Sequence, residues 1–526
     1  MFKYFVVVDD PDHKDQVHTE LQSTFGSTTV PTRPVSCDDN MPGSLHNGLF
    51  WLTPEEAETL NSDPRVRDVH RIPEDDDISL GLHGSRAGVF DRSFASVTTS
   101  MRNWALSRST NTVDNFYGAT STSTPYTYNL DGTGVDIIIM DSGVEANHPE
   151  FAVNADGTGG SRVVNYDWTQ HGIITSVPTG GFMGDSEGHG TNVASIAAGN
   201  TCGWASNAAI YSMRIYGGTD VYTGATLGAL NELQCWQTIR AFHLAKSTTS
   251  TGYKRPTIVN CSFGYYANYD NMASVNYRGS TIALTTTTGN GATLYGTIGS
   301  AEAGDGTCPS RYSAEEADIA AAIAVGVIVV GSAGNNAHKI DVSGGLDYNN
   351  YWTNGTGSSK YYHRGSSPAA APGVISVGSI SYSVPEHKAS YSSTGPRVNV
   401  FAPGSAIMGA YCSASFTAAV QDPRNTAYYL DKLQGTSQAS PQVTGMVALL
   451  AQARPWVTAT NVLNFIQSSA AKGKLSETYY ATTGTVYTNF ASLHGTGNYY
   501  AYFPFNKDYV MTTNSATVAL SSASIP

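Results

Sequence analysis

The chain has 526 residues, of which 40% are hydrophobic and 13% charged, and its formal net charge is −13. This length predicts two or three domains, one of them large. The acidic balance argues against nucleic acid and anionic membranes as partners, because both are bound through clusters of Lys and Arg, and no apolar run has transmembrane length.

The first 77 residues have the pattern of a small, separate α+β domain. Apolar runs predict strands at Tyr4–Val8, Gly48–Leu52 and Val66–Ile72, and a helix is expected over Asp15–Thr24. Thr53 is a suitable N-cap for a second helix, because a proline and two acidic residues follow it.

Other segments lack this periodicity. Residues 78–103 are expected to be a linker, preceded by an acidic run at 74–77 that we expect to be solvated. Residues 468–526 are rich in Thr, Tyr, Gly and Asn and are expected to form a C-terminal extension with a mobile tail. The six cysteines have no zinc-binding spacing and are expected to be free thiols. No secretory signal is recognisable, so we expect a protein that stays in the cell or travels in a virus particle rather than a secreted one.

From Val135 onward the pattern is that of an α/β sheet. Val135–Met140 and Val325–Val330 are nearly continuous apolar runs, which are typical of parallel strands covered on both faces. Ile258–Ser262 and Val374–Gly378 are shorter strand candidates, and the clearest helix is Ala439–Ala453.

Three short segments carry polar residues that structure alone does not require. Asp141 ends an apolar strand, and catalytic groups collect at the carboxyl ends of strands in open α/β sheets. His189 lies between two glycines at a helix start, and Ser437 lies at the N-terminus of the long helix, where developing negative charge is favoured. Taken singly, each has a structural alternative: a helix-capping Asp, a structural His and an N-cap Ser. Together, in the order Asp, His, Ser, they predict a catalytic triad.

The triad segments resemble those of the subtilisin-like serine proteases, or subtilases, and Asp141–Phe151 is most similar to the proteinase K branch. The resemblance covers roughly residues 100 to 465. It implies a three-layer α/β fold with a mainly parallel central sheet, which we expect to span residues 104–467, and a serine endopeptidase that works through an acyl-enzyme. Asn335, which follows an apolar strand, would give its amide to the oxyanion hole together with the backbone N–H of Ser437; the alternative is a turn residue.

The resemblance also implies residues that contact substrate. The candidates are Ser262, Phe263, Gly264, Ala333, Gly334, Thr219, Asp220 and Val221. The first three would line one wall of the pocket for the residue before the scissile bond, the next two the opposite wall, and the last three a second strand that pairs with substrate. Because backbone pairing would carry recognition, we expect broad specificity, with an apolar or aromatic residue in the pocket.

Three positions near the triad depart from the family pattern. Gln438 replaces a Met, Gln442 replaces a His, and Asn192 replaces the second His of the usual His-Gly-Thr-His pattern. Two stretches, 265–312 and 340–366, are longer than the family usually has and are expected to be surface insertions near the substrate cleft.

Asn399 stands where the proteinase K branch has a calcium-binding Asp. Loss of a carboxylate weakens an oxygen site for calcium, so we expect calcium to stabilise this chain less than its relatives, and we expect no other cofactor.

Within the first domain, Asn47–Glu56 and Asp63–Val69 resemble the inhibitory propeptides of subtilisins. This implies a ferredoxin-like prodomain that binds the cleft and is removed by self-cleavage in the linker; the alternative is an unrelated binding domain. The expected partners are protein substrates and the chain's own propeptide. A structural or assembly protein that carries the protease fold, for example in a virion, is the main rival hypothesis. A lipase or esterase is a weaker rival, because the Gly-x-Ser-x-Gly motif is absent.

Overall fold

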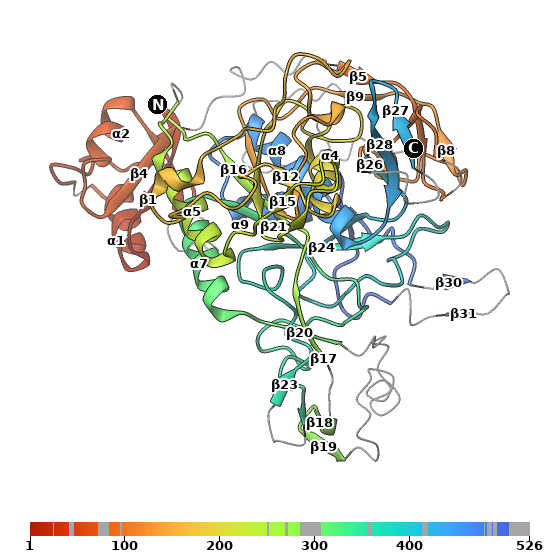
Figure 1. The fold of residues 1–526 in the computed structure, drawn as a ribbon. Coiled ribbons are helices and arrows are strands. Elements are labelled where there is room, and N and C mark those ends of the chain that lie inside the picture. Colours follow the sequence, from red (N-terminus) through yellow and green to blue (C-terminus); the bar gives the residue numbers. More distant parts are fainter. Residues whose placement is uncertain are drawn as a thin grey trace. The chain divides into compact units, whose positions relative to one another are not determined.

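The computed structural model describes residues 1–24, 26–40, 47–71, 84–94, 97–249, 252–268, 272–283, 307–354, 359–412, 419–477, 479–480, 486–487 and 492–503. The chain divides into two compact units (Figure 1). Of the described residues, the first unit contains 1–71 and 247–255 and the second contains 84–246 and 256–503, each with the gaps given above. The acidic run at 74–77 and the tail from 504 to 526 lie outside the described residues.

The first unit is a four-stranded antiparallel sheet with two helices. Its elements in chain order are β1 (Phe2–Val8), α1 (Pro11–Gln22), β2 (Cys37–Asp39), β3 (Asn47–Leu52), α2 (Pro54–Leu60) and β4 (Val66–Arg71). Thr53 and Glu56 form the expected cap of α2, since each side chain accepts a hydrogen bond from the other residue's backbone N–H. Helix α1 begins earlier than expected, because Asp10 caps it and Pro11 is its first residue.

The second unit is built on an eight-stranded sheet in the order β13-β10-β16-β21-β24-β25-β32-β29. All neighbouring pairs are parallel except β29 with β32. The strands are β13 (Ala209–Arg214), β10 (Asp136–Asp141), β16 (Thr257–Cys261), β21 (Ile328–Ser332), β24 (Ile375–Ile380), β25 (Val400–Pro403), β32 (Tyr499–Tyr500) and β29 (Ala471–Lys472). The predicted three-layer α/β fold with a mainly parallel sheet is therefore confirmed.

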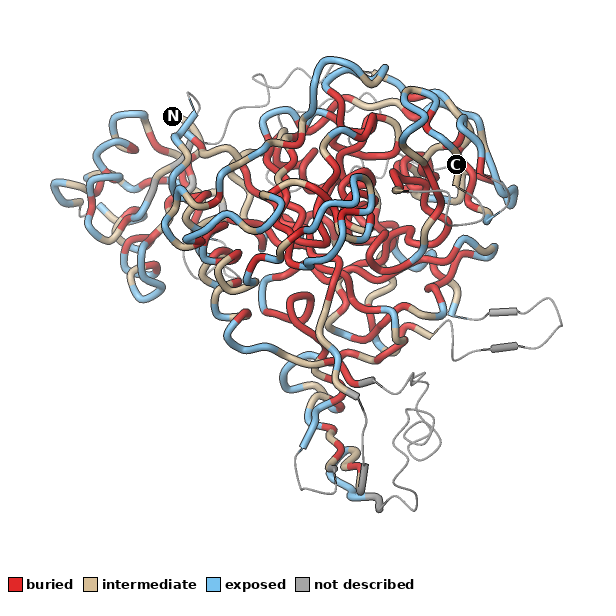
Figure 2. Tube along the Cα trace, in the orientation of Figure 1, coloured by how far each residue is buried: buried red, intermediate tan, exposed pale blue. Residues whose placement is uncertain are grey.

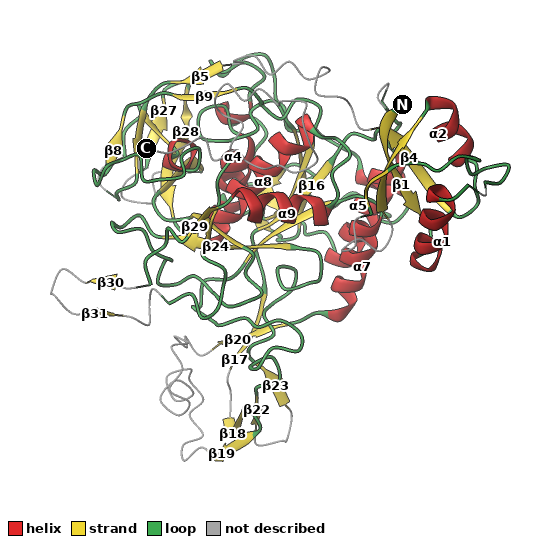
Figure 3. Ribbon diagram, turned by 180° about the vertical axis from the view of Figure 1, so that it is seen from behind, coloured by secondary structure: helices red, strands yellow, loops and turns green. Residues whose placement is uncertain are grey.

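Helices cover both faces of this sheet, and its central strands are buried (Figures 2 and 3). Helices α5 (Glu232–Ala245) and α7 (Ser313–Ala324) share a core with Ile138 and Met140 of β10. Helices α4 (His189–Ala198) and α8 (Thr436–Ala453) pack together and contact the central strands, and α9 (Ala459–Ser469) follows α8 in the chain. Since both faces are covered, the strands need apolar residues throughout, as in the runs that predicted them.

The structure differs from two expected domain boundaries. Much of the expected linker is ordered within the second unit as β5 (Gly84–Arg86), β6 (Val89–Asp91) and β7 (Met101–Arg102). These short strands pair with each other or with β8 (Ser121–Thr122) and β9 (Tyr126–Tyr128). Part of the expected C-terminal extension also belongs to the fold, because β29 and β32 lie at the edge of the central sheet. Such short strands have too little periodicity to be found in a sequence.

The two insertions fold together into an accessory sheet, defined here as β19-β18-β22-β23. The first insertion supplies β18 (Met272–Tyr277) and β19 (Ser280–Ala283), and the second supplies β22 (Tyr351–Asn354) and β23 (Ser359–Tyr361). The antiparallel pair of β17 (Tyr265–Asn268) and β20 (Thr307–Ser310) lies at its base (Figures 1 and 3). The insertions share a small core of Val275, Cys308, Trp352 and Tyr362.

Glu315 in the first turn of α7 is a completely buried acid. Its Oε1 accepts a hydrogen bond from Nε1 of Trp236 at 3.0 Å, whereas Oε2 is buried and has no hydrogen-bond partner among the described residues. Burial, assisted by the nearby charges of Glu232 and Glu316, raises the pKa of Glu315 from 4.5 to about 7. The folded state therefore holds this proton more tightly than the unfolded state.

It follows that stability should decrease as pH rises from the unfolded pKa near 4.5 through the folded pKa near 7. The loss from this group is about 3 kcal/mol, complete above the folded pKa. Glu315→Gln keeps an acceptor for Trp236 and should remove this contribution, so urea unfolding at pH 5 and pH 9 should show a smaller pH effect than in the unmodified chain. Asp318→Asn on the same helix is the control. Equal pH effects in the chain with and without Glu315→Gln would contradict the prediction.

Candidate active site

Asp141 and His189, predicted from separate motifs, form a hydrogen-bonded pair. Asp141 is the last residue of β10 and is 1% exposed, and its Oδ1 lies 2.7 Å from Nδ1 of His189 at the start of α4. Burial alone would lower the pKa of His189, but the charge of Asp141 and this hydrogen bond outweigh burial and raise it. Because Nδ1 faces Asp141, Nε2 is the nitrogen left to act on another group, and the side chain of His189 is 31% exposed.

Asp185, which the sequence reasoning missed, holds the start of α4 in place. It is fully buried, and its Oδ1 accepts hydrogen bonds from the backbone N–H groups of Glu187 and Gly188. Its Oδ2 accepts from the backbone and hydroxyl of Thr191, at 2.9 and 2.6 Å. The Ser142 hydroxyl also donates to Oδ1 at 2.7 Å, so Asp185 connects the helix of His189 to the residue after Asp141. The sequence signal for Asp185 was its position, four residues before the histidine that starts the helix.

Gly190 explains why a glycine follows His189. A Cβ at this position would lie 2.1 Å from the carbonyl oxygen of Gly143 and 3.1 Å from Cβ of Asp141. Only glycine therefore lets the helix approach the aspartate segment this closely.

Ser437 lies in the first turn of α8 and is 9% exposed. Its hydroxyl donates to the carbonyl oxygen of Ser262 at 3.1 Å, and the Ser262 hydroxyl donates to the carbonyl oxygen of Ser437 at 3.0 Å. The neighbouring Gln438 donates from Nε2 to Oδ1 of Asn192 at 3.1 Å. This bond joins the first turn of α8, which carries Ser437, to the first turn of α4, which carries His189.

Two of the departures from the family pattern are thus partners of each other, Gln438 and Asn192. The third, Gln442, is fully buried and also has partners: its Oε1 accepts from Nε1 of Trp204 at 2.7 Å and from Nδ2 of Asn103 at 2.9 Å. These side chains are therefore satisfied in a polar network, which accounts for their burial without a catalytic role.

Asn335 and the backbone of Ser437 both lie close to Gly435. The side-chain oxygen of Asn335 accepts hydrogen bonds from the backbone N–H and hydroxyl of Thr436, both at 2.8 Å, which orients Nδ2. A Cβ built on Gly435 would lie 2.8 Å from Oε1 of Gln438 and 3.4 Å from both Asn335 Nδ2 and the Ser437 backbone N. Asn335 Nδ2 and the Ser437 N–H therefore both adjoin Gly435, and two neighbouring N–H donors are what an oxyanion hole requires.

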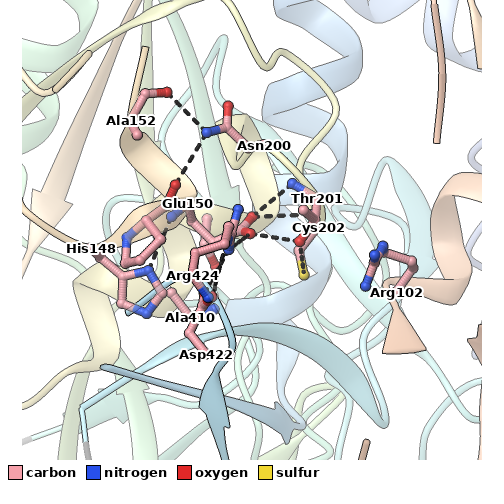
Figure 4. Close-up of polar contacts among 12 residues, drawn as sticks. Arg102, His148, Glu150, Ala152, Asn200, Thr201, Cys202, Ala410, Asp422 and Arg424 are labelled. Atoms are coloured by element: carbon pink, nitrogen blue, oxygen red, sulfur yellow. Dashed lines mark hydrogen bonds and ion pairs between the residues drawn. The ribbon is translucent and has the colours of Figure 1, made fainter. Parts of the chain in front are cut away.

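A buried ion network ties together the segments that carry these residues (Figure 4). Glu150, in the short 3-10 helix Pro149–Phe151, accepts from the Thr201 hydroxyl at 2.6 Å and from the backbone N–H groups of Thr201 and Cys202, just beyond α4. Glu150 also pairs with Arg424, which pairs in turn with Asp422 at 2.6 Å. Arg424 lies between β27 (Val420–Asp422) and β28 (Asn425–Leu433), the hairpin that precedes Ser437 in the chain.

Of the predicted substrate segments, two adjoin Ser437 and the third forms a separate short hairpin. Ser262 contacts Ser437, and the backbone N–H of Gly334 donates to the Thr436 hydroxyl at 3.1 Å, so both expected walls adjoin the serine. Thr219 belongs to a short hairpin strand, and Thr219 and Val221 are exposed. The carboxylate of Asp220, in contrast, accepts from the backbone N–H groups of Tyr222 and Thr223 within its own turn. Asp220 thus shapes this loop.

The residues around Asn399 do not fit a calcium ion. Asn399 Oδ1, the oxygen expected to face the metal, accepts hydrogen bonds from the Ser376 backbone N–H and from Nη1 of Arg397, both at 2.9 Å. Nη2 of the same guanidinium donates to the carbonyl oxygens of Ala371 and Val374, at 2.6 and 2.9 Å. Burial lowers the pKa of Arg397 to about 10, which leaves it charged at neutral pH. A calcium ion at Asn399 would meet a like charge that already binds the local oxygens.

We therefore expect thermal melts with calcium and with a chelator to give the same Tm within about one degree. Asn399→Asp should remain insensitive, because the new carboxylate would pair with Arg397. The double variant Arg397→Ala with Asn399→Asp should gain a calcium response, because it frees the carbonyls and adds a carboxylate. A large fall in Tm when chelator is added to the unmodified chain would contradict this prediction.

Within the described part of the chain, no three His, Cys, Asp or Glu residues are grouped as metal ligands. None of the helices in this part of the chain has the length and hydropathy needed to cross a membrane.

Comparison with known proteins agrees with the geometry. The model of the subtilase family of peptidases (Peptidase_S8) matches residues 132–497. Subtilisin-like proteinase Mp1 of Magnaporthiopsis poae is 26% identical over 66% of this chain and 61% of its own length. Alkaline serine exoprotease A of Vibrio alginolyticus is 25% identical over 84% of this chain and 57% of its own length. The matches thus span about three fifths of these relatives.

A solved structure of a cold-adapted subtilisin-like serine proteinase aligns with 76% of this chain and 97% of its own, with 21% identity and a TM-score of 0.46. Because the family model matches well over half of the sequence, the chain belongs to the subtilase family.

Proposed function

We propose that this chain is a serine endopeptidase that hydrolyses peptide bonds through an acyl-enzyme. The observation that carries the proposal is the hydrogen-bonded pair of Asp141, at the end of β10, and His189, at the start of α4. The first turn of α4 is joined through Asn192 and Gln438 to the helix start that carries Ser437. Asn335 Nδ2 and the Ser437 N–H, which both adjoin Gly435, support the same chemistry.

In the proposed mechanism, Ser437 Oγ turns from the Ser262 carbonyl toward Nε2 of His189 and attacks the substrate carbonyl carbon. His189 takes the hydroxyl proton, and Asp141 stabilises the charged imidazole. The oxyanion accepts hydrogen bonds from Asn335 Nδ2 and the Ser437 N–H. His189 then gives its proton to the leaving amine as the C–N bond breaks, and water, deprotonated by His189, hydrolyses the acyl-enzyme.

We further propose that the first unit is a propeptide that the chain removes from itself. The strand and helix order of that unit supports this proposal, because it is the pattern that resembles the inhibitory propeptides. We place the cut before Gly84, because β5 and β6 already belong to the second unit. The expected linker offers Leu80, Leu82, Phe90 and Phe94 as apolar residues before a cut. Phe90 is fully buried and Phe94 is 43% exposed, whereas Leu80 and Leu82 lie outside the described residues.

A fluorophosphonate probe tests the proposal, followed by peptide mapping and intact mass measurement. The active chain should be labelled at Ser437 and should have lost its N-terminal unit, whereas Ser437→Ala should be unlabelled and full-length. An unlabelled but folded protein would instead support the rival hypothesis of a structural or assembly protein. A labelled, fully active enzyme that still begins at Met1 would exclude self-processing and leave the peptidase proposal standing.

A further inference from the structure

The two walls next to Ser437 each contain a glycine. Gly264 follows Ser262, which exchanges hydrogen bonds with Ser437, and Gly334 binds the residue before Ser437 through its backbone N–H. Because a glycine has no side chain, its α carbon would ordinarily leave open space for a ligand to approach.

In this chain the space beside Gly334 is filled by Tyr266. A Cβ on Gly334 would lie 2.3 Å from the phenolic oxygen of Tyr266 and 3.1 Å from Oγ of Ser393. Tyr266 belongs to β17, at the base of the accessory sheet, and is paired in register with Pro309 of β20. The ring of Tyr266 also lies 6.2 Å, centroid to centroid, from that of His338. The backbone that carries Tyr266 is thus held by its pairing with β20, and the phenolic oxygen lies against Gly334.

The space beside Gly264 is filled in the same way by Ser366. A Cβ on Gly264 would lie 2.5 Å from Oγ of Ser366, which is 3% exposed. Ser366 is the last residue of the second insertion, and the backbone N–H of Ser367 donates to the carbonyl oxygen of Ser310 in β20 at 3.1 Å. Tyr266 and Ser366, which supply the two covering hydroxyls, are therefore both connected to the β17–β20 strand pair at the base of the accessory sheet.

We propose that Tyr266 and Ser366 narrow the pocket between these walls, so that the chain cleaves peptides with a small uncharged residue, Gly, Ala or Ser, before the scissile bond. This inference rests on the proposed peptidase function and names smaller residues than the apolar or aromatic ones expected from the sequence. A substrate side chain that extends beyond Cβ would have to displace the buried hydroxyl of Ser366 or the phenol of Tyr266, which is 37% exposed but has its backbone paired with β20, and the rate should fall. The accessory sheet thereby supports substrate selection.

The test uses fluorogenic peptides that are identical except for Ala, Ser, Leu or Phe before the scissile bond. The unmodified chain should show a higher kcat/KM for Ala and Ser than for Phe. Tyr266→Ala should raise the ratio of the Phe to the Ala value by about tenfold or more, and Ser366→Gly should change the ratio in the same direction. Because the ratio compares two substrates on one preparation, a partly unfolded variant does not distort it. Tyr361→Ala is the control, since Tyr361 is an exposed tyrosine of β23 that contacts Tyr351 and Arg364.

A preference of the unmodified chain for Phe, or an unchanged ratio in Tyr266→Ala, would overturn the inference. Probe labelling at Ser437 in the same samples distinguishes this failure from that of the peptidase proposal: labelled protein with a Phe preference leaves that proposal intact, whereas folded protein with neither labelling nor cleavage overturns both.

Discussion

Ser437→Ala should abolish peptide hydrolysis and leave the fold intact. The three members of a triad act as a unit, so removing the nucleophile is expected to lower kcat by about 10⁶, the size of the loss found for the serine of subtilisin. Among the described residues, the side-chain bond lost is the one from the Ser437 hydroxyl to the Ser262 carbonyl, and the reciprocal bond from the Ser262 hydroxyl remains. Initial rates on a peptide substrate, with circular dichroism to check folding, measure the effect.

Ser440→Ala is a suitable control on the same helix, because Ser440 is buried and bonded to Asn260 rather than to the proposed reacting groups. It should lose some stability and keep most activity. If folded Ser437→Ala retained a tenth of the activity, Ser437 would not be the nucleophile.

Arg424→Met should have the largest effect on stability, about 3–5 kcal/mol at neutral pH. The change leaves two fully buried carboxylates, Glu150 and Asp422, without their shared counter-charge. Burial by itself would raise the pKa of Glu150, but Arg424 and the hydrogen bonds from Thr201 outweigh it and lower the pKa from 4.5 to about 2. The stabilisation from Glu150 is therefore complete above its unfolded pKa and is lost as pH falls toward the folded value.

The loss caused by Arg424→Met should accordingly be large at pH 7 and smaller at pH 4, where protonation relieves the unpaired acids. Urea unfolding in the Ser437→Ala background measures it without self-digestion. Adding Glu150→Gln to Arg424→Met should recover part of the stability, because a neutral amide needs no counter-charge. An effect that does not change with pH and is not relieved by Glu150→Gln would show that Arg424 acts only through packing.

Local patterns in the sequence were enough to predict the main elements and the residues of the candidate triad. The continuous apolar run at Val135–Met140 identified β10, because a strand buried on both faces has no polar side. Asp141, His189 and Ser437 could be selected because each stands where an apolar pattern begins or ends, and polar residues there have few structural reasons. The order of the three motifs and their surroundings indicated the subtilase family.

The tertiary structure decided which distant residues contact these groups and which side chains cover the glycines beside Ser437. Glu150 and Arg424 are 274 positions apart, and neither has a local signal that names its partner. The two insertions likewise gave no sign that they pair, and their pairing is set by backbone hydrogen bonds that any sequence can make. Tyr266 lies against Gly334, and Arg397 binds the oxygens near Asn399, only because the folded chain brings their segments together. Short-range periodicity therefore determined the elements and the candidate catalytic residues at their ends, whereas long-range packing determined what covers Gly334, the unfavourable setting for calcium and the buried ion network.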